Sequence, residues 1–235
     1  FWDPHLDACQ GFRVLRYDTR GQGRSSRPPG PYTLEGLAAD TIAVLDELGI
    51  DKVHFVGVSM GGMIGQTVAL TEPGRLLSLA LVNTTPLYSD AQRDAWRERA
   101  TVVLEDGMAA VHDGLMRRWF TDEAIAAGNA GYMYMADIVS RFAPESFDAV
   151  TAAMCQLDTT DRLHQITART LVVAAPEDPG VPPELSQRLA SDIPDSDLHW
   201  LSPARHLATL EYVDRFNELL RNHLAQAPHV SRPPS

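Results

Sequence analysis

The sequence predicts an α/β fold, in which a doubly wound and mainly parallel sheet carries helices on both faces. Short apolar, β-branched runs alternate with longer amphipathic stretches, as they do in strand–helix–strand units. At the end of one such run a serine is flanked by glycines, where a strand is expected to pass sharply into a helix. A chain of 235 residues with 44% hydrophobic and 22% charged residues can bury one sizeable core.

Residues 1–85 are expected to form the first part of the sheet core. Arg13–Tyr17 has the composition of a strand and leads into a loop rich in Gly and Ser. Thr33 is a suitable N-cap for a helix with an apolar stripe over Leu34–Leu48, and Gly49 is a suitable end for it.

A serine between glycines follows in the stretch Gly57-Val58-Ser59-Met60-Gly61-Gly62. The strand Lys52–Val56 precedes it, the helix Met63–Leu70 follows it, and Leu77–Val82 predicts the next strand. The glycines allow a sharp, strained turn that raises the serine hydroxyl above the sheet. An ordinary Gly-rich turn is the alternative, but the strand–turn–helix context favours a nucleophile elbow.

Residues 86–160 predict successive helices and no strand. Bulky side chains gather there, among them Trp96, Trp119, Phe120 and the run Tyr132–Met135. Two interpretations remain open. The segment is a helical cap or lid over a pocket, or it is an ordinary helical subdomain whose aromatic side chains form its own core.

Residues 161–226 return to the alternation and complete the predicted core. The expected elements are a strand over Thr170–Ala175, a helix over Glu184–Ala190, a strand over Asp197–Leu201 and a final helix over about His206–Leu224. The last stretch, 227–235, is rich in Pro and Ser and predicts a flexible tail.

An acid and a base for the serine are found at the carboxyl ends of the last two strands, where ligand sites of doubly wound sheets gather. Asp178 follows the strand Thr170–Ala175, and His206 follows the strand Asp197–Leu201. The order Ser59, Asp178, His206 is that of a serine–acid–histidine triad. Glu177 is the competing carboxylate, and turn formation or a helix start is the alternative explanation for Asp178 and His206.

Composition excludes several classes of function. The net charge of −11, with no Lys/Arg cluster, argues against nucleic-acid binding. The sequence has no apolar run of membrane-spanning length, and no signal peptide is visible. We expect a cytoplasmic protein from its two cysteines, which suit a reducing compartment. Cys9 and Cys155 lie far apart, as expected of inert thiols in a reducing compartment. No Cys-x-x-Cys or His-Glu-x-x-His pairing supports a metal site.

Several stretches resemble the α/β-hydrolase superfamily, namely Tyr17–Ser25, Pro31–Leu34, Gly57–Gln66 and Arg205–Leu207 with Glu211. A narrower resemblance, to the 3-oxoadipate enol-lactonases, covers nearly the whole chain and rests on Phe1–Pro4, Arg13–Gly21, Arg118–Thr121 and Leu157–Leu163. Non-metal haloperoxidases and small esterases share much of this pattern.

The resemblance implies hydrolysis of a small carboxylated enol-lactone in the aromatic-acid catabolism of bacteria, the β-ketoadipate pathway, without metal or organic cofactor. It implies Ser59 as nucleophile, His206 as base, Asp178 as its orienting acid and the backbone N–H of Met60 as an oxyanion donor. Trp119 and Arg118 are candidates for binding the substrate carboxylate, although packing alone could explain both.

Alternatives remain open beside the enol-lactonase. One is a carboxylesterase, and another is a cofactor-free haloperoxidase or perhydrolase, each on the same triad. A non-catalytic binding module of the same fold is a third. The sequence leaves the oligomeric state open.

The chain departs from the family pattern in two places. Family members have a His-Gly turn, the source of a second oxyanion donor, before the Trp-Asp-Pro stretch, and this sequence begins just after it. We therefore expect an N-terminally incomplete chain that lacks the first strands, including one between the strand before Asp18 and the strand before Ser59, and that is poorly stable or weakly active. The loop Pro176-Glu177-Asp178 also lacks a glycine that the family usually has there.

Overall fold

The computed structural model describes residues 1–227, and the sheet within that range has four parallel strands. Their order across the sheet is β1 (Val53–Val58), β2 (Leu76–Val82), β3 (Arg169–Ala174) and β4 (Ser196–Trp200), with each neighbouring pair parallel. This confirms the parallel α/β sheet expected from the alternating pattern. The bounds of these four strands differ from the expected ones by at most two residues.

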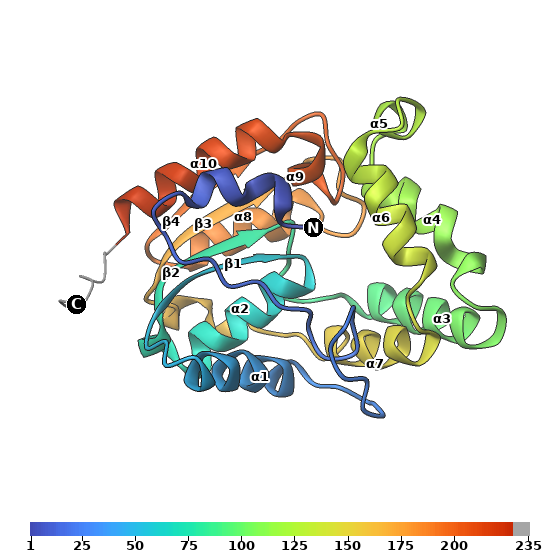
Figure 1. Cartoon of the computed structure of the whole chain (residues 1–235), viewed down its shortest axis with the longest axis horizontal. Helices are drawn as coiled ribbons and strands as arrows, with labels where there is room; N and C mark the ends of the chain where they lie inside the picture. Colours follow the sequence, from blue (N-terminus) through green and yellow to red (C-terminus); the bar gives the residue numbers. More distant parts are fainter. Residues whose placement is uncertain (228–235) are drawn as a thin grey trace.

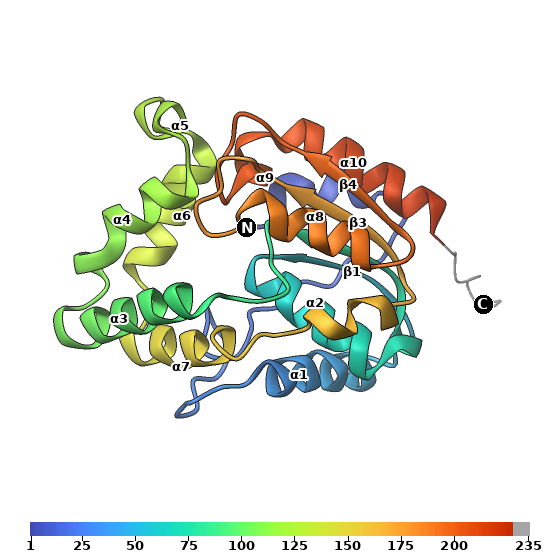
Figure 2. The same ribbon diagram turned by 180° about the vertical axis from the view of Figure 1, so that it is seen from behind.

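Helices cover both faces of the sheet (Figures 1 and 2). One face carries α1 (Leu34–Glu47), α2 (Met60–Thr71) and α8 (Pro183–Asp192). The other face carries the 3-10 helix η1 (Asp3–Cys9), α9 (Ala208–Glu211) and α10 (Val213–Gln226). Two further 3-10 turns are η2 (Pro73–Arg75) and η3 (Thr160–Gln165). The sheet is therefore doubly wound, as predicted.

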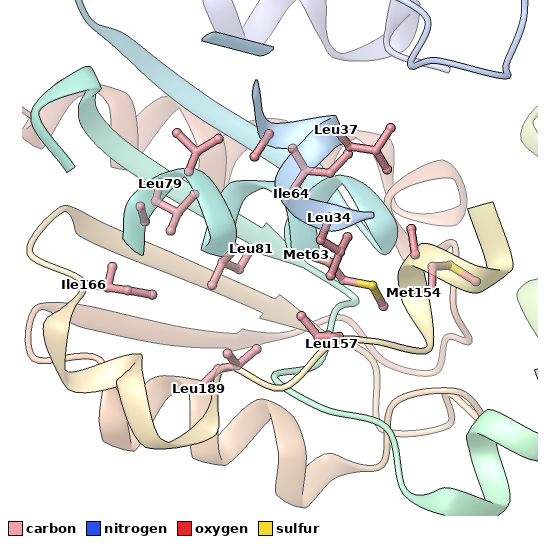
Figure 3. Close-up of a cluster of buried hydrophobic side chains, with 14 of the residues drawn as sticks. Leu34, Leu37, Met63, Ile64, Leu79, Leu81, Met154, Leu157, Ile166 and Leu189 are labelled. Carbon is pink, nitrogen blue, oxygen red and sulfur yellow. The ribbon is translucent and has the colours of Figure 1, made fainter. Parts of the chain in front are cut away.

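The central strand β2 shows why the two faces are both buried. Leu79 and Leu81 point into the cluster with α1 and α2, drawn in Figure 3, while Ala80 and Val82 point into the cluster with α10. All four side chains are fully buried. Since successive side chains of a strand point to opposite faces, a continuous apolar run is what a strand between two helix layers requires.

The helix α1 has the predicted cap. The hydroxyl oxygen of Thr33 accepts a hydrogen bond from the N–H of Gly36 at 3.0 Å, and Gly49 takes a φ of +64° at the other end. The apolar stripe is buried up to Leu45, whereas Leu48 at its end is exposed.

Five helices lie between β2 and β3 and form a body beside the carboxyl ends of the strands (Figure 1). They are α3 (Asp90–Asp106), α4 (Ala109–Trp119), α5 (Asp122–Ala126), α6 (Ala130–Ser140) and α7 (Pro144–Met154). An isolated antiparallel bridge between Leu87 and Asp158 brings the two ends of this insertion together. An apolar cluster joins the insertion to the residues after His206: it contains Phe120, which is fully buried, together with Leu207 and Leu210.

The bulky side chains of the insertion do not all support the same one of the two interpretations, a lid or a subdomain with its own core. Phe120 packs edge to face on Tyr132, with ring centroids 5.8 Å apart, which is a core role. Met133 and Tyr134 are exposed. The Trp119 ring lies beside that of His206, as described below.

The strand expected over Arg13–Tyr17 is wrong. This stretch runs outside the sheet, Val14, Leu15 and Tyr17 are exposed, and in the described part of the chain β1 pairs with β2 alone. β-Propensity reflects a fit to neighbouring strands, so an apolar stretch without a strand beside it does not form one. That first strands are missing stays a prediction.

The final helix expected over His206–Leu224 is interrupted and begins later. α9 and α10 are separated at Tyr212, whose φ of −122° and ψ of 54° are not helical. The Tyr212 hydroxyl donates to the carbonyl of Pro203 at 2.8 Å, which ties the interruption to the preceding turn. His206 therefore lies on a loop. Residues 228–235, most of the predicted tail, lie outside the described residues.

Within residues 1–227, no helix is both long enough and apolar enough to cross a membrane.

Candidate active site

Ser59 lies at a strained turn between β1 and α2. Its φ of 54° and ψ of −118° place a residue with a side chain in a region that glycine favours. Hydrogen bonds on both sides hold this conformation: the Ser59 N–H donates to the carbonyl of Val82 at 2.9 Å, and the Thr84 hydroxyl donates to the carbonyl of Ser59 at 2.8 Å. The predicted strand–turn–helix arrangement is present.

The glycines around Ser59 serve close approach rather than conformational freedom. None of them has a positive φ, whereas Ser59 does. A Cβ at position 57 would lie 2.2 Å from the carbonyl oxygen of Gly61, and one at position 62 would lie 2.6 Å from Thr84. A Cβ at position 61 would meet nothing within 4 Å. The expected reason for the glycines is therefore corrected: Gly57 and Gly62 let the turn pack tightly.

The structure brings Ser59, His206 and Asp178 together in one continuous relay. His206 Nε2 lies 2.8 Å from the Ser59 hydroxyl, and His206 Nδ1 lies 2.7 Å from Asp178 Oδ2. The Asp178 side chain is fully buried and that of His206 is 12% exposed. Because the carboxylate accepts the proton of Nδ1, the lone pair of Nε2 is left to accept the serine proton.

Asp178, and not Glu177, is the carboxylate of this relay. Glu177 is exposed, whereas Asp178 points inward. The second carboxylate oxygen, Oδ1, accepts from the N–H groups of Gly180 at 2.8 Å and Val181 at 3.2 Å. These donors fix the carboxylate although the loop lacks the glycine that the family usually has before the acid.

Sequence reasoning missed Asn83 and Thr84, which follow β2. The Asn83 side-chain amide donates to Asp178 Oδ2 at 3.3 Å, and the Thr84 hydroxyl bonds to Ser59 as described above. The signal that could have found them is their position, since they follow the strand Leu77–Val82 at the same carboxyl edge that identified Asp178 and His206.

Met60 follows Ser59 as the first residue of α2. The N–H groups of Gly62 and Met63 both donate to the carbonyl of Ser59, at 2.9 and 3.1 Å. The first N–H groups of a helix have no acceptor within the helix, and the helix dipole adds partial positive charge at this end. An anionic oxygen above Ser59 would therefore be stabilised at this helix end. This is the environment in which the Met60 N–H could act as an oxyanion donor.

The end of α4 places Trp119 and Arg118 beside the relay. The rings of Trp119 and His206 have centroids 6.4 Å apart and are tilted by 32°. Arg118 donates to the carbonyl of Pro179 at 3.2 Å, next to Asp178. Tyr88 is buried near them, and burial together with the charge of Asp178 raises the pKa of its hydroxyl.

A cleft of about 530 Å³ lies apart from this site, between α6 and the turn from α9 to α10. It is lined by Asn129–Gly131 and Leu210–Arg215 among other residues, and it contains none of the relay. We locate the candidate active site at Ser59, because the relay supplies a nucleophile and a base and the cleft does not.

A parallel sheet with a nucleophile elbow and a Ser–His–Asp relay at the carboxyl ends of its strands defines a hydrolase. Comparison with known proteins agrees. The family model described as alpha/beta hydrolase fold matches residues 1–212, and the chain belongs to this family.

Curated relatives of this chain are also hydrolases by name. This chain is 34% identical over 217 residues to 3-oxoadipate enol-lactonase 2 of Acinetobacter baylyi. The matched region covers 92% of this chain and 80% of that protein. The chain is 34% identical over 223 residues to the "Putative carbamate hydrolase RutD" of Caulobacter segnis, with 93% and 84% covered.

Among solved structures, the enol-lactonase from Burkholderia xenovorans LB400 superposes with a TM-score of 0.91 at 30% identity, and 96% of this chain and 86% of that chain are covered. The likeness to enol-lactonases that the motifs suggested is thus confirmed. The protein is therefore an enzyme of the α/β-hydrolase family.

Proposed function

We propose that this protein opens a small enol-lactone that carries a carboxylate, of the 3-oxoadipate enol-lactone type, with Ser59 as nucleophile. The observation that carries the proposal is the relay from Ser59 through His206 to Asp178, with heavy-atom distances of 2.8 and 2.7 Å. A serine hydroxyl becomes a useful nucleophile when an oriented base takes its proton, and this geometry provides one.

The reaction follows from the positions of these groups. The Ser59 oxygen attacks the lactone carbonyl while its proton passes to His206 Nε2. The developing oxyanion accepts from the Met60 N–H. The ring C–O bond then breaks, and the leaving enolate takes the proton from the imidazolium. Water, deprotonated by His206, hydrolyses the acyl-enzyme and frees Ser59. Asp178 holds the imidazole tautomer throughout.

The substrate class is supported by two observations. Two relatives with the name enol-lactonase are 34% and 30% identical to this chain over most of its length. The cation of Arg118 lies at the end of α4, next to the Asp178 loop, where it could face a substrate carboxylate. On this view residues 86–160 act as a lid and the enzyme works in cytoplasmic aromatic-acid catabolism.

Carbamate hydrolysis is a second candidate, because the RutD relative is as similar, at 34% identity. A carboxylesterase and a cofactor-free perhydrolase would use the same triad. A substrate panel separates these activities: the enol-lactone followed by loss of its ultraviolet absorbance, a carbamate, neutral p-nitrophenyl esters and peracid formation. The proposal requires the enol-lactone to have the highest kcat/KM of the panel.

The Ser59→Ala variant completes the test. It should lose turnover while its circular dichroism spectrum stays that of the wild type. Lactone turnover retained in this variant would rule out the covalent mechanism. A wild-type enzyme that prefers the carbamate in the substrate panel would instead be assigned as a carbamate hydrolase.

A further inference from the structure

The residue before His206 connects the loop that carries it to the helical insertion. Arg205 Nη1 donates to the carbonyls of Arg117 at 2.8 Å and Phe120 at 2.9 Å, and it lies 3.1 Å from Asp122 Oδ1. We call residues 117–122, where α4 ends and α5 begins, the α4–α5 corner. The last carbonyls of a helix have no acceptor role within it, so one guanidinium satisfies the end of α4.

Glu211 holds the same corner from the other side. Its carboxylate accepts from the Thr121 N–H at 3.3 Å and from the Thr121 hydroxyl. Thr121 is the N-cap of α5, so the negative charge lies at a helix N-terminus, where it is favourable. Charge-assisted bonds of this kind are about twice as strong as neutral ones.

One backbone hydrogen bond and one side-chain hydrogen bond complete the connection. The Leu207 N–H donates to the carbonyl of Trp119 at 2.9 Å, and Arg118 donates to the carbonyl of Pro179 beside Asp178. The α4–α5 corner therefore touches both loops of the relay, the one that carries the histidine and the one that carries the acid. His206 itself lies outside any helix or strand, so these contacts, together with its bonds to Ser59 and Asp178, define its place.

We infer that Arg205 and Glu211 are positioning residues, which lock the His206 loop to the α4–α5 corner and so keep the imidazole aligned between Ser59 and Asp178. The inference rests on the proposed function in taking His206 as the base. Neither residue needs to touch the substrate. A displacement of about 1 Å in a reacting group can cost on the order of 100-fold in rate, so a loosened loop should be visible in kcat.

The kinetic test compares Arg205→Ala with Arg205→Lys on a neutral p-nitrophenyl ester and on one that carries a carboxylate. For Arg205→Ala we expect kcat to fall on the order of 30-fold or more on both esters, with KM nearly unchanged. Lysine keeps the charge and much of the reach, and should restore most of the activity. Arg215→Ala, which removes an exposed arginine paired with Glu218 on α10, is the matched control and should match the wild type.

A second readout needs no substrate. The Nδ1 proton that His206 shares with Asp178 should give a strongly deshielded proton resonance, which should broaden or vanish in Arg205→Ala and persist in Arg205→Lys. Because this signal is independent of turnover, failure of the enol-lactone proposal would leave it intact. Glu211→Gln carries the same two readouts if Arg205→Ala does not fold.

Two results would overturn the inference. One is a folded Arg205→Ala or Glu211→Gln variant whose kcat and deshielded resonance equal those of the wild type. The other is a loss confined to the carboxylated ester, since that would make Arg205 a substrate-binding residue.

Discussion

Asn83 donates its side-chain amide to Asp178 Oδ2, the same oxygen that lies 2.7 Å from His206 Nδ1. Both residues are buried, so the carboxylate meets a fixed donor in place of water. Asn83 also has a φ of 43°, and its N–H donates to the carbonyl of Val173 at 2.8 Å, which ties β2 to β3 at this point. Asn is one of the few residues with a side chain that tolerates this conformation.

The Asn83→Gly variant separates the contribution of the side-chain amide from that of the backbone conformation. Glycine accepts the positive φ but removes the donor, and a hydrogen bond to a charged group contributes about 1.5–3 kcal/mol, so kcat/KM should fall on the order of 10-fold or more. Asn83→Ala should lose the same activity and about 1 kcal/mol more stability, because alanine is strained at this φ. Full activity in Asn83→Gly would show that the donor does not orient Asp178.

Gly57 and Gly61 provide a matched pair at the elbow. Gly57→Ala drives a Cβ onto the backbone carbonyl of Gly61, 2.2 Å away, where no side chain can move aside. It should destabilise the protein by about 3 kcal/mol. Gly61→Ala meets open space inside α2 and should stabilise it by about 0.5–1 kcal/mol. Urea unfolding checks both, and similar midpoints for the two variants would contradict the close approach.

Strain at Ser59 can be measured in inactive variants. Ser59→Gly and Ser59→Ala should both lack turnover, but glycine relieves the strain at φ 54° while alanine keeps it. We expect Ser59→Gly to be the more stable by about 1–2 kcal/mol. Equal free energies of unfolding would mean that the elbow stores no strain.

The strands and the relay were predictable because each depends on a local pattern and on one topological rule. Buried strands such as Leu77–Val82 are short apolar runs, and the carboxyl ends of parallel strands meet at one edge. That rule alone predicts that Ser59, Asp178 and His206 lie close together at one edge of the sheet. Residue type then identified the serine, the carboxylates and the histidine, and position relative to the strand ends favoured Asp178 over Glu177.

What the sequence could not supply are contacts between distant segments. Arg205 bonds with residues more than 80 positions away, and nothing in its neighbourhood predicts that. Arg13–Tyr17 has strand composition but pairs with no strand of the sheet within the described residues. The interruption at Tyr212 follows from its bond to Pro203, which a continuous amphipathic pattern does not reveal.

Buried His223 makes stability depend on pH. Burial, aided by the charge of Arg169, lowers its pKa from 6.5 to about 4. Between these values the unfolded chain binds a proton that the folded protein does not, so stability should fall as the pH falls from about 6.5 toward 4, by about 3 kcal/mol. His223→Leu should flatten this part of the profile in urea unfolding, and His164→Gln, which removes an exposed histidine, is the control. A profile as steep in His223→Leu as in the wild type would assign the pH dependence to other groups.

Arg118 tests the carboxylate in the proposed substrate. If its cation binds that group, Arg118→Gln should raise KM for the enol-lactone on the order of 10-fold, because a hydrogen bond to a charged group is lost, while KM for a neutral p-nitrophenyl ester stays the same. Arg118 also donates to the carbonyl of Pro179, and loss of that bond would loosen the Asp178 loop and slow both substrates equally. The ratio of the two effects therefore separates binding from positioning. Arg117→Gln, at the exposed neighbouring position, controls for the loss of one positive charge.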